Sequence, residues 1–130
     1  MRMRTLPMLG TVAGLCAATA VALASAGLGS PVIISDSLHM ATGNLGTASK
    51  ATDMQLIGCF AWTADTGNWG ICQAMDGTGK SRSCFTSSPN HLQSIRAING
   101  DTHVTFQWNP ATGNCTAIMV DNSSNLEPKT

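Results

Sequence analysis

Residues 54–75 have the sequence MQLIGCFAWTADTGNWGICQAM, in which two apolar runs flank a short polar segment. The runs contain the aromatic and β-branched residues that are typical of strands, whereas the segment 65–68, Asp-Thr-Gly-Asn, is typical of a turn. Two strand-like runs joined by so short a turn predict a β-hairpin, and a hairpin indicates an antiparallel sheet.

The position of the turn sets the register of this hairpin. If the turn is centred between residues 65 and 66, Cys59 lies across from Cys72 and Trp62 lies across from Trp69. A disulfide and an aromatic pair would then stabilise one register. A bulge at Gly67 would shift the pairing by one residue, so both registers stay open at this point.

The N-terminus has the pattern of a cleavable secretory signal peptide. Arg2 and Arg4 precede an uncharged apolar run, residues 6–23, and residues 24–26, Ala-Ser-Ala, offer the small side chains that a signal peptidase requires. We therefore expect residues 1–26 to be removed and the rest to be secreted, to the cell exterior or the periplasm. The alternative is that the apolar run stays as a membrane anchor.

Removal of residues 1–26 leaves an even set of cysteines, Cys59, Cys72, Cys84 and Cys115. In a small chain bound for an oxidising compartment, such a set indicates disulfides. We favour Cys59 with Cys72 and Cys84 with Cys115, because the first pair flanks the predicted turn. The spacing contains no CxxC pair and no histidine at ligand spacing, which disfavours zinc, so we expect no metal and no cofactor.

The rest of the chain predicts further strands. A turn signal at 76–79 precedes a short run at 81–86. From residue 102 to 108 apolar and polar residues alternate, and after a turn at 109–113 the run 115–121 returns as a second hairpin.

One helix is predicted between these strands. Ser88 offers a capping hydroxyl, and Pro89 suits the first helical position. Leu92, Ile95 and Ile98 then recur at helical spacing until an Asn-Gly pair ends the pattern.

These elements predict one small domain of class α+β or mainly β. We expect an antiparallel sheet of about five or six strands, with two hairpins, one short helix and two disulfides. Residues 27–52 are interpreted as a flexible lead-in rich in Gly, Ser, Thr and Ala that contributes at most one strand, at the apolar patch 32–34. Residues 53–122 are interpreted as the disulfide-stapled globular domain, and residues 123–130 as a polar tail.

The charge of the processed chain limits its partners. Beyond residue 26 the sequence holds five basic and seven acidic side chains, a net charge of −2. Such a surface offers no cationic region for nucleic acid or for anionic lipid. We therefore expect a monomer that binds no nucleic acid and, after removal of the signal, no membrane.

The triplet Asp65-Thr66-Gly67 resembles the catalytic loop of aspartic proteases, in which two carboxylates share a proton. The flanking residues differ from that family, because Thr63-Ala64 precede the triplet and Asn68 follows it. Turn chemistry explains the same residues without catalysis.

A Ser-His-Asp constellation is the other catalytic hypothesis. Asp101 and His103 share one face of the predicted strand, and Ser83 or Ser94 could supply a nucleophile. His39 and His91 are the other imidazoles of the chain. No GxSxG element accompanies any of them, and a surface histidine is commonly a solvated residue, so we assign no catalytic residue.

The tryptophans support a different hypothesis. Trp62, Trp69 and Trp108 either fill the core or form an exposed surface for a sugar or a protein partner. Trp62 and Trp69 are the better surface candidates because they flank a turn and alternate with polar residues. With Asp65 and Asn68 they make up the candidate binding site.

The predicted function is therefore that of a small secreted, disulfide-stabilised, non-enzymatic module that binds an extracellular protein or a glycan. One alternative is an inhibitor of an extracellular enzyme that presents the rigid loop 65–68. Another is a small secreted hydrolase that uses His103 with Asp101 or Asp65.

Overall fold

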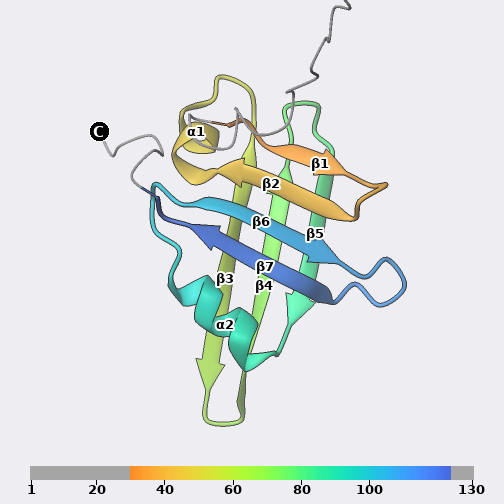
Figure 1. Ribbon diagram of the computed structural model, residues 1–130, viewed down its shortest axis with the longest axis vertical. Helices are drawn as coiled ribbons and strands as arrows, with labels where there is room; N and C mark the ends of the chain where they lie inside the picture. Colours follow the sequence, from red (N-terminus) through yellow and green to blue (C-terminus); the bar gives the residue numbers. More distant parts are fainter. Residues whose placement is uncertain (1–29, 124–130) are drawn as a thin grey trace, which may run out of the picture.

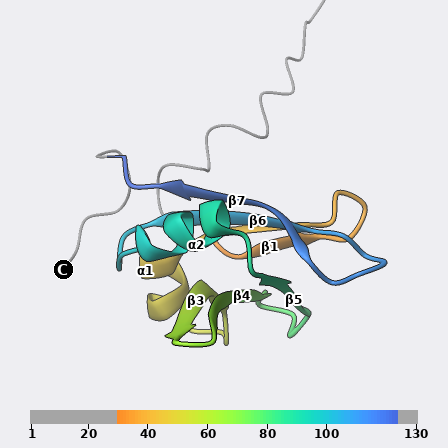
Figure 2. The ribbon, with the colours of Figure 1, turned by 90° about the horizontal axis from the view of Figure 1, so that it is seen from below.

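The computed structural model describes residues 30–123 and shows two facing antiparallel sheets with two helices at one side (Figures 1 and 2). One sheet has four strands in the order β1-β2-β6-β7, and the other has three in the order β3-β4-β5. In chain order the elements are β1 (Ile33–Ser35), β2 (Met40–Asn44), α1 (Leu45–Lys50), β3 (Leu56–Ala64), β4 (Gly67–Met75), β5 (Ser81–Thr86), α2 (Pro89–Arg96), β6 (His103–Trp108) and β7 (Cys115–Asp121).

The three-stranded sheet is built on the predicted hairpin. β3 and β4 are joined by a two-residue turn, with Cys59 opposite Cys72 and Trp62 opposite Trp69. The predicted register is confirmed, and no bulge interrupts it. Gly67, at the start of β4, has a φ of +148°. Residues that carry a side chain rarely adopt this conformation, so glycine suits this position.

The four-stranded sheet contains the second predicted hairpin, β6 and β7. Its register shifts between Gln107 and Trp108, where β7 begins. On its other edge β6 pairs with β2, so that Ala41 lies opposite Phe106 and Asn44 lies opposite His103. A segment from the first half of the chain therefore forms one of the two central strands of this sheet.

Residues 27–52, predicted as a flexible lead-in, contribute β1, β2 and α1. Ala41 and Asn44 are fully buried. A Cβ atom on Gly43 would lie only 3.1 Å from the Cα of Val32, so small residues are needed at this crowded position. The globular unit thus begins earlier than predicted, because small residues that lack periodicity can still form a central strand.

The core lies between the sheets. Val104 and Phe106 of the four-stranded sheet are fully buried, as is Cys72 of the three-stranded sheet. Leu92 and Ile95 bring the apolar side of α2 into the same core. Figure 2 shows both helices on one side of the molecule, where they close the space between the two layers.

Both predicted disulfides are present. Cys59–Cys72 joins the neighbouring strands β3 and β4, whereas Cys84–Cys115 joins β5 to β7 and so ties one sheet to the other. Disulfides persist in oxidising compartments and are rare in the reducing cytosol. The pairing thus indicates a non-cytosolic compartment.

The predicted fold class is confirmed, since the protein is mostly β. The described residues form seven strands, against about five or six expected, and these divide between two sheets. Helix α2 begins at Pro89 as predicted but ends at Arg96, before Ile98. The other helix, α1, was not predicted, because its six residues show no clear periodicity. It begins after Asn44, whose side chain accepts a hydrogen bond from the Thr47 backbone N–H.

The predicted signal peptide, residues 1–26, lies outside the described residues, as does most of the predicted tail, residues 123–130. Within residues 30–123, neither helix is long and apolar enough to cross a membrane. Secretion itself therefore stays a prediction.

Candidate functional site

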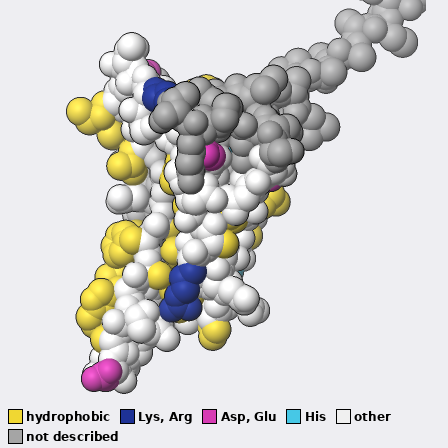
Figure 3. All heavy atoms as spheres, turned by 90° about the vertical axis from the view of Figure 1, so that its left-hand side faces the viewer, with side chains coloured by type: hydrophobic (Ala, Val, Ile, Leu, Met, Phe, Trp, Pro, Cys, Tyr) yellow, Lys and Arg dark blue, Asp and Glu magenta, His cyan; other side chains and the backbone are white. Residues whose placement is uncertain are grey.

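The outer face of the three-stranded sheet carries a group of exposed aromatic side chains. Alternation along the strands sends Ile57, Cys72 and Cys84 inward and their neighbours outward. The outward residues are Leu56, Gly58, Phe60, Trp62, Trp69, Ile71, Gln73, Met75, Ser81, Ser83 and Phe85. None of them is charged, and in Figure 3 hydrophobic side chains line the left-hand edge of the molecule.

Four of these rings, Phe60, Trp62, Trp69 and Phe85, form a cluster that we name the aromatic face. Trp69 is central, with its ring centroid 5.5 Å from that of Trp62, 5.7 Å from that of Phe60 and 6.0 Å from that of Phe85. The three outer side chains are partly exposed: Phe60 by 45%, Trp62 by 47% and Phe85 by 44%. Aromatic pairs at such distances each stabilise by about 0.5–1.5 kcal/mol beyond burial, so the cluster keeps a defined shape.

The structure separates the tryptophans into two environments. Trp62 and Trp69 lie on the aromatic face, the surface location considered for them. Trp108 is buried in the core, where its ring contacts those of Phe106 and His39. The core interpretation thus describes Trp108, and the surface interpretation describes Trp62.

The other two predicted binding residues lie at the tip of the β3–β4 hairpin. Asp65 is in the turn, and Asn68 pairs with Thr63 just beyond it; both are exposed. Within residues 30–123, no hydrogen bond or ion pair involves Asp65, so no second carboxylate shares a proton with it. The arrangement that an aspartic protease needs is not formed among residues 30–123 of one chain.

Sequence reasoning missed two members of the aromatic face, Phe60 and Phe85. Phe60 lies two residues before Trp62 on the same strand, so alternation alone places both rings on one face. Phe85 joins them only because β5 pairs with β4, where it lies opposite Ile71. The pattern of a single strand holds no sign of that pairing.

No protein-family model, curated protein or solved structure matches this chain. Its function therefore has to follow from the chemistry of its own residues: the aromatic face, the histidines and the cysteines.

The residues of the hydrolase hypothesis lie apart. His103 lies on the outer face of the four-stranded sheet, with its Nε2 2.8 Å from the Thr42 hydroxyl. Across the β6–β7 pair it faces Asp121 rather than Asp101. Ser83 lies on the outer face of the opposite sheet, and Ser94 lies on helix α2. The structure thus does not bring a serine, a histidine and an aspartate together from this set.

His103 is a buried and neutral imidazole. Burial lowers its pKa, and the carboxylate of Asp121 raises it by a smaller amount. Its Nδ1 has no hydrogen-bond partner within residues 30–123. The other two imidazoles have separate surroundings, since His39 packs on Trp108 and His91 contacts the Thr86 hydroxyl at 2.8 Å.

Within residues 30–123, one group of three side chains is close enough to ligate a metal. The Sγ atoms of Cys72, Cys84 and Cys115 all lie within 4.8 Å of one another, and all three residues are buried. Each sulfur is bonded to another sulfur. Because a metal requires thiolates, this oxidised group has no ligand to offer.

Proposed function

We propose that this protein is a secreted, non-enzymatic module that binds another protein through the aromatic face. The observation that carries the proposal is the exposure of Phe60, Trp62 and Phe85 on a sheet face that no helix or strand of residues 30–123 covers. Contiguous apolar surface of this kind marks interaction sites on soluble proteins. An inhibitor of an extracellular enzyme would be one case of such a module.

The composition of the outer face supports a protein partner. The buried centre of a protein interface is depleted in charges and enriched in aromatic residues and methionine. The outward residues of this sheet include all four rings of the aromatic face together with Ile71 and Met75, and none of them is charged. A partner with an apolar surface can cover it without burying an unpaired charge.

The arrangement of the rings favours a protein over a glycan. A sugar ring stacks on the open face of an aromatic ring and also needs hydrogen-bonding groups beside it. Trp62 and Phe85 lie on the strands on either side of β4, with ring planes at 33° and 28° to that of Trp69, so the central indole is flanked on both sides. The nearest polar pair on the same face, Gln73 and Ser83, lies beyond Ile71 in the register.

A hollow lies at the end of this face farther from the hairpin tip. It has a volume of about 530 Å³, and its lining includes Leu56, Met75 and Ser81. Binding energy in protein interfaces concentrates where one side chain enters a pocket beside a packed apolar patch. A partner that covers the aromatic face can place such a side chain here.

Secretion is the second part of the proposal. The two disulfides support an oxidising compartment. The charged start, apolar run and small-residue exit of residues 1–26 support export with cleavage. Determination of the N-terminal residue of the natural protein tests this part, and a chain that still begins at Met1 would contradict it.

Binding is tested by capture from the culture fluid in which the protein is made. The variant with Trp62→Ser and Phe85→Ser removes half of the aromatic face. The matched control carries Leu38→Ser and Met119→Ser, which replace two apolar residues outside this sheet that are more exposed than Trp62 and Phe85. All three proteins are immobilised, and bound proteins are identified and their affinities measured.

We expect the wild type and the control to capture the same partner. Loss of a central aromatic contact costs about 2 kcal/mol or more, so we expect the face variant to bind at least about 30-fold more weakly. Equal binding by the face variant would contradict the proposal. If a carbohydrate binds the wild type but not the face variant, the partner is a glycan and not a protein.

A further inference from the structure

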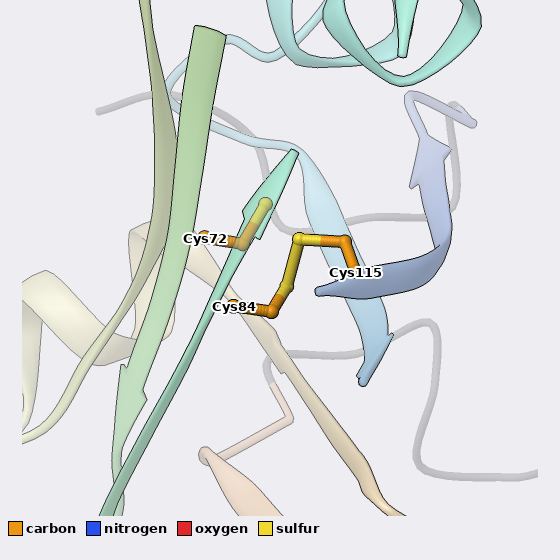
Figure 4. A group of neighbouring side chains, drawn as sticks. All are labelled: Cys72, Cys84 and Cys115. Carbon is orange, nitrogen blue, oxygen red and sulfur yellow. A yellow bond between two sulfur atoms is a disulfide. The ribbon is translucent and has the colours of Figure 1, made fainter. Parts of the chain in front are cut away.

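The two disulfides lie against each other in the core. Cys72 is bonded to Cys59, but in the register of β4 and β5 it also lies directly across from Cys84. Its Sγ is within 4.8 Å of both sulfurs of the Cys84–Cys115 bridge. Figure 4 shows the Cys72 side chain beside that bond. One sulfur of the first bridge is thus a neighbour of both sulfurs of the second.

The second bridge borders a cavity. This cavity has a volume of about 300 Å³, and its lining includes Cys115, His91 and Ser88. Ser88 is the residue before helix α2, so the partly positive N-terminal end of the helix lies at the cavity and favours a thiolate there. Cys84 does not line the cavity. A small thiol that enters therefore meets Cys115 first.

We propose that the four cysteines form a thiol–disulfide exchange site whose substrate is a small dithiol. A thiolate of the dithiol attacks the Sγ of Cys115, the bond to Cys84 breaks, and Cys84 leaves as a thiolate. Cys84 then attacks the Sγ of Cys72. The Cys72–Cys84 bond forms, the Cys59–Cys72 bond breaks, and Cys59 leaves as a thiolate that takes up a proton.

The second thiol of the substrate completes the reaction. It attacks the mixed disulfide on Cys115, closes the dithiol into its own disulfide and releases Cys115, which takes up a proton. One dithiol is oxidised, and one protein disulfide is reduced to the thiols of Cys59 and Cys115. The remaining bridge, Cys72–Cys84, joins β4 to β5.

The exchange has a direction because the sulfurs differ in burial. Cys84 is 2% exposed, and the interior disfavours a thiolate there. Cys59 is only half-buried and lies on the edge strand β3. Attack on Cys72 therefore moves the negative charge from the core to the better-solvated sulfur.

The first test uses the folded wild-type protein and a limiting amount of dithiothreitol. The reaction is stopped with acid, free thiols are alkylated, and the protein is digested with trypsin. Cleavage after lysine and arginine separates three peptides, 51–80 with Cys59 and Cys72, 83–96 with Cys84, and 97–129 with Cys115. Mass spectrometry then identifies which peptides are cross-linked.

The two outcomes differ in their cross-links. In the native pairing, peptide 83–96 is joined to 97–129. We expect a partly reduced species in which 83–96 is joined instead to 51–80, with Cys59 and Cys115 alkylated. A partly reduced population that contains only native bridges would overturn the proposal.

A matched pair of variants tests the geometry without a reductant. Cys59→Ser and Cys72→Ser remove the same bridge, so each loses the same loop closure. The first leaves the thiol of Cys72 beside Cys84 and Cys115, whereas the second leaves that of Cys59, whose sulfur is not in that group. We expect peptide 83–96 to be joined to peptide 51–80 in Cys59→Ser. In Cys72→Ser we expect no such cross-link. Equal amounts in the two variants would contradict the proposal, and if Cys59→Ser does not fold, the wild-type experiment decides.

Discussion

Gly70 of β4 lies directly against Ile95 of α2. A Cβ atom on Gly70 would be 2.8 Å from the Cδ1 of Ile95, 3.0 Å from the carbonyl oxygen of Phe60 and 3.1 Å from the Cδ2 of Leu92. Helix α2 therefore rests on the sheet at a position that a side chain would occupy. The close approach of helix and strand depends on this glycine.

Gly70→Ala is expected to lower the free energy of unfolding by about 1–3 kcal/mol, because the added methyl group forces the helix away from the sheet. Urea denaturation measures the change. The matched control is Gly58→Ala in the same hairpin, where a Cβ atom meets nothing within 4 Å. We expect the control to be neutral or slightly stabilising. An equal loss in both variants would show that the helix contact is not the cause.

The two disulfides are expected to contribute unequally to stability. Loss of Cys84–Cys115, which closes a separation of 31 residues, should cost about 4 kcal/mol, against about 3 kcal/mol for Cys59–Cys72, which closes 13. Paired alanine substitutions and urea denaturation test the order. We expect this order because only Cys84–Cys115 joins the two sheets. A larger loss of stability on removal of Cys59–Cys72 would contradict the prediction.

The exposure of the tryptophans can be measured by acrylamide quenching of their fluorescence. Trp62 is 47% exposed and Trp108 is 8% exposed. We expect Trp62→Phe to remove most of the quenchable emission, because acrylamide reaches only rings that contact water. Trp108→Phe should remove mainly protected emission. The reverse result would place Trp62 in a covered environment and would also remove the support for the aromatic face as a binding surface.

Burial of His103 predicts a dependence of stability on pH. Burial lowers the pKa of this imidazole in the folded state, whereas the unfolded chain titrates near the ordinary value of about 6.5. Below that pH the unfolded state binds a proton that the folded state does not. Stability is therefore fully present above about pH 6.5 and falls below it, by at most about 1.4 kcal/mol per pH unit, until the folded pKa is reached.

His103→Gln keeps a hydrogen-bonding group near Thr42 but cannot titrate, so it should flatten this part of the profile. Urea denaturation at a series of pH values measures it. Carboxylates act in a separate range: hydrogen bonds from Lys80 and Arg82 lower the pKa of Asp36, so its contribution is lost only as the pH falls below about 4. An unchanged slope in His103→Gln below about pH 6.5 would assign the effect to another group.

Local patterns predicted much of the fold. The hairpin of residues 54–75 was correct in register because its strands are joined by a tight turn, which leaves few ways to pair them. The start of α2 at Pro89 followed from the fixed backbone of proline. Strand β2, residues 40–44, was not predicted, because its small residues fill crowded positions and show no alternation of apolar and polar residues.

By itself, the sequence determined the hairpin and favoured the register that pairs Cys59 with Cys72 and Trp62 with Trp69, since each of these depends on residues close together in the chain. Only the tertiary structure decided that Phe85 completes the aromatic face and that Cys72 lies beside the Cys84–Cys115 bridge. Those relationships depend on which strands become neighbours. That choice is made when the inner faces of two sheets are buried against each other, a free energy that belongs to the whole chain and not to any one segment of it.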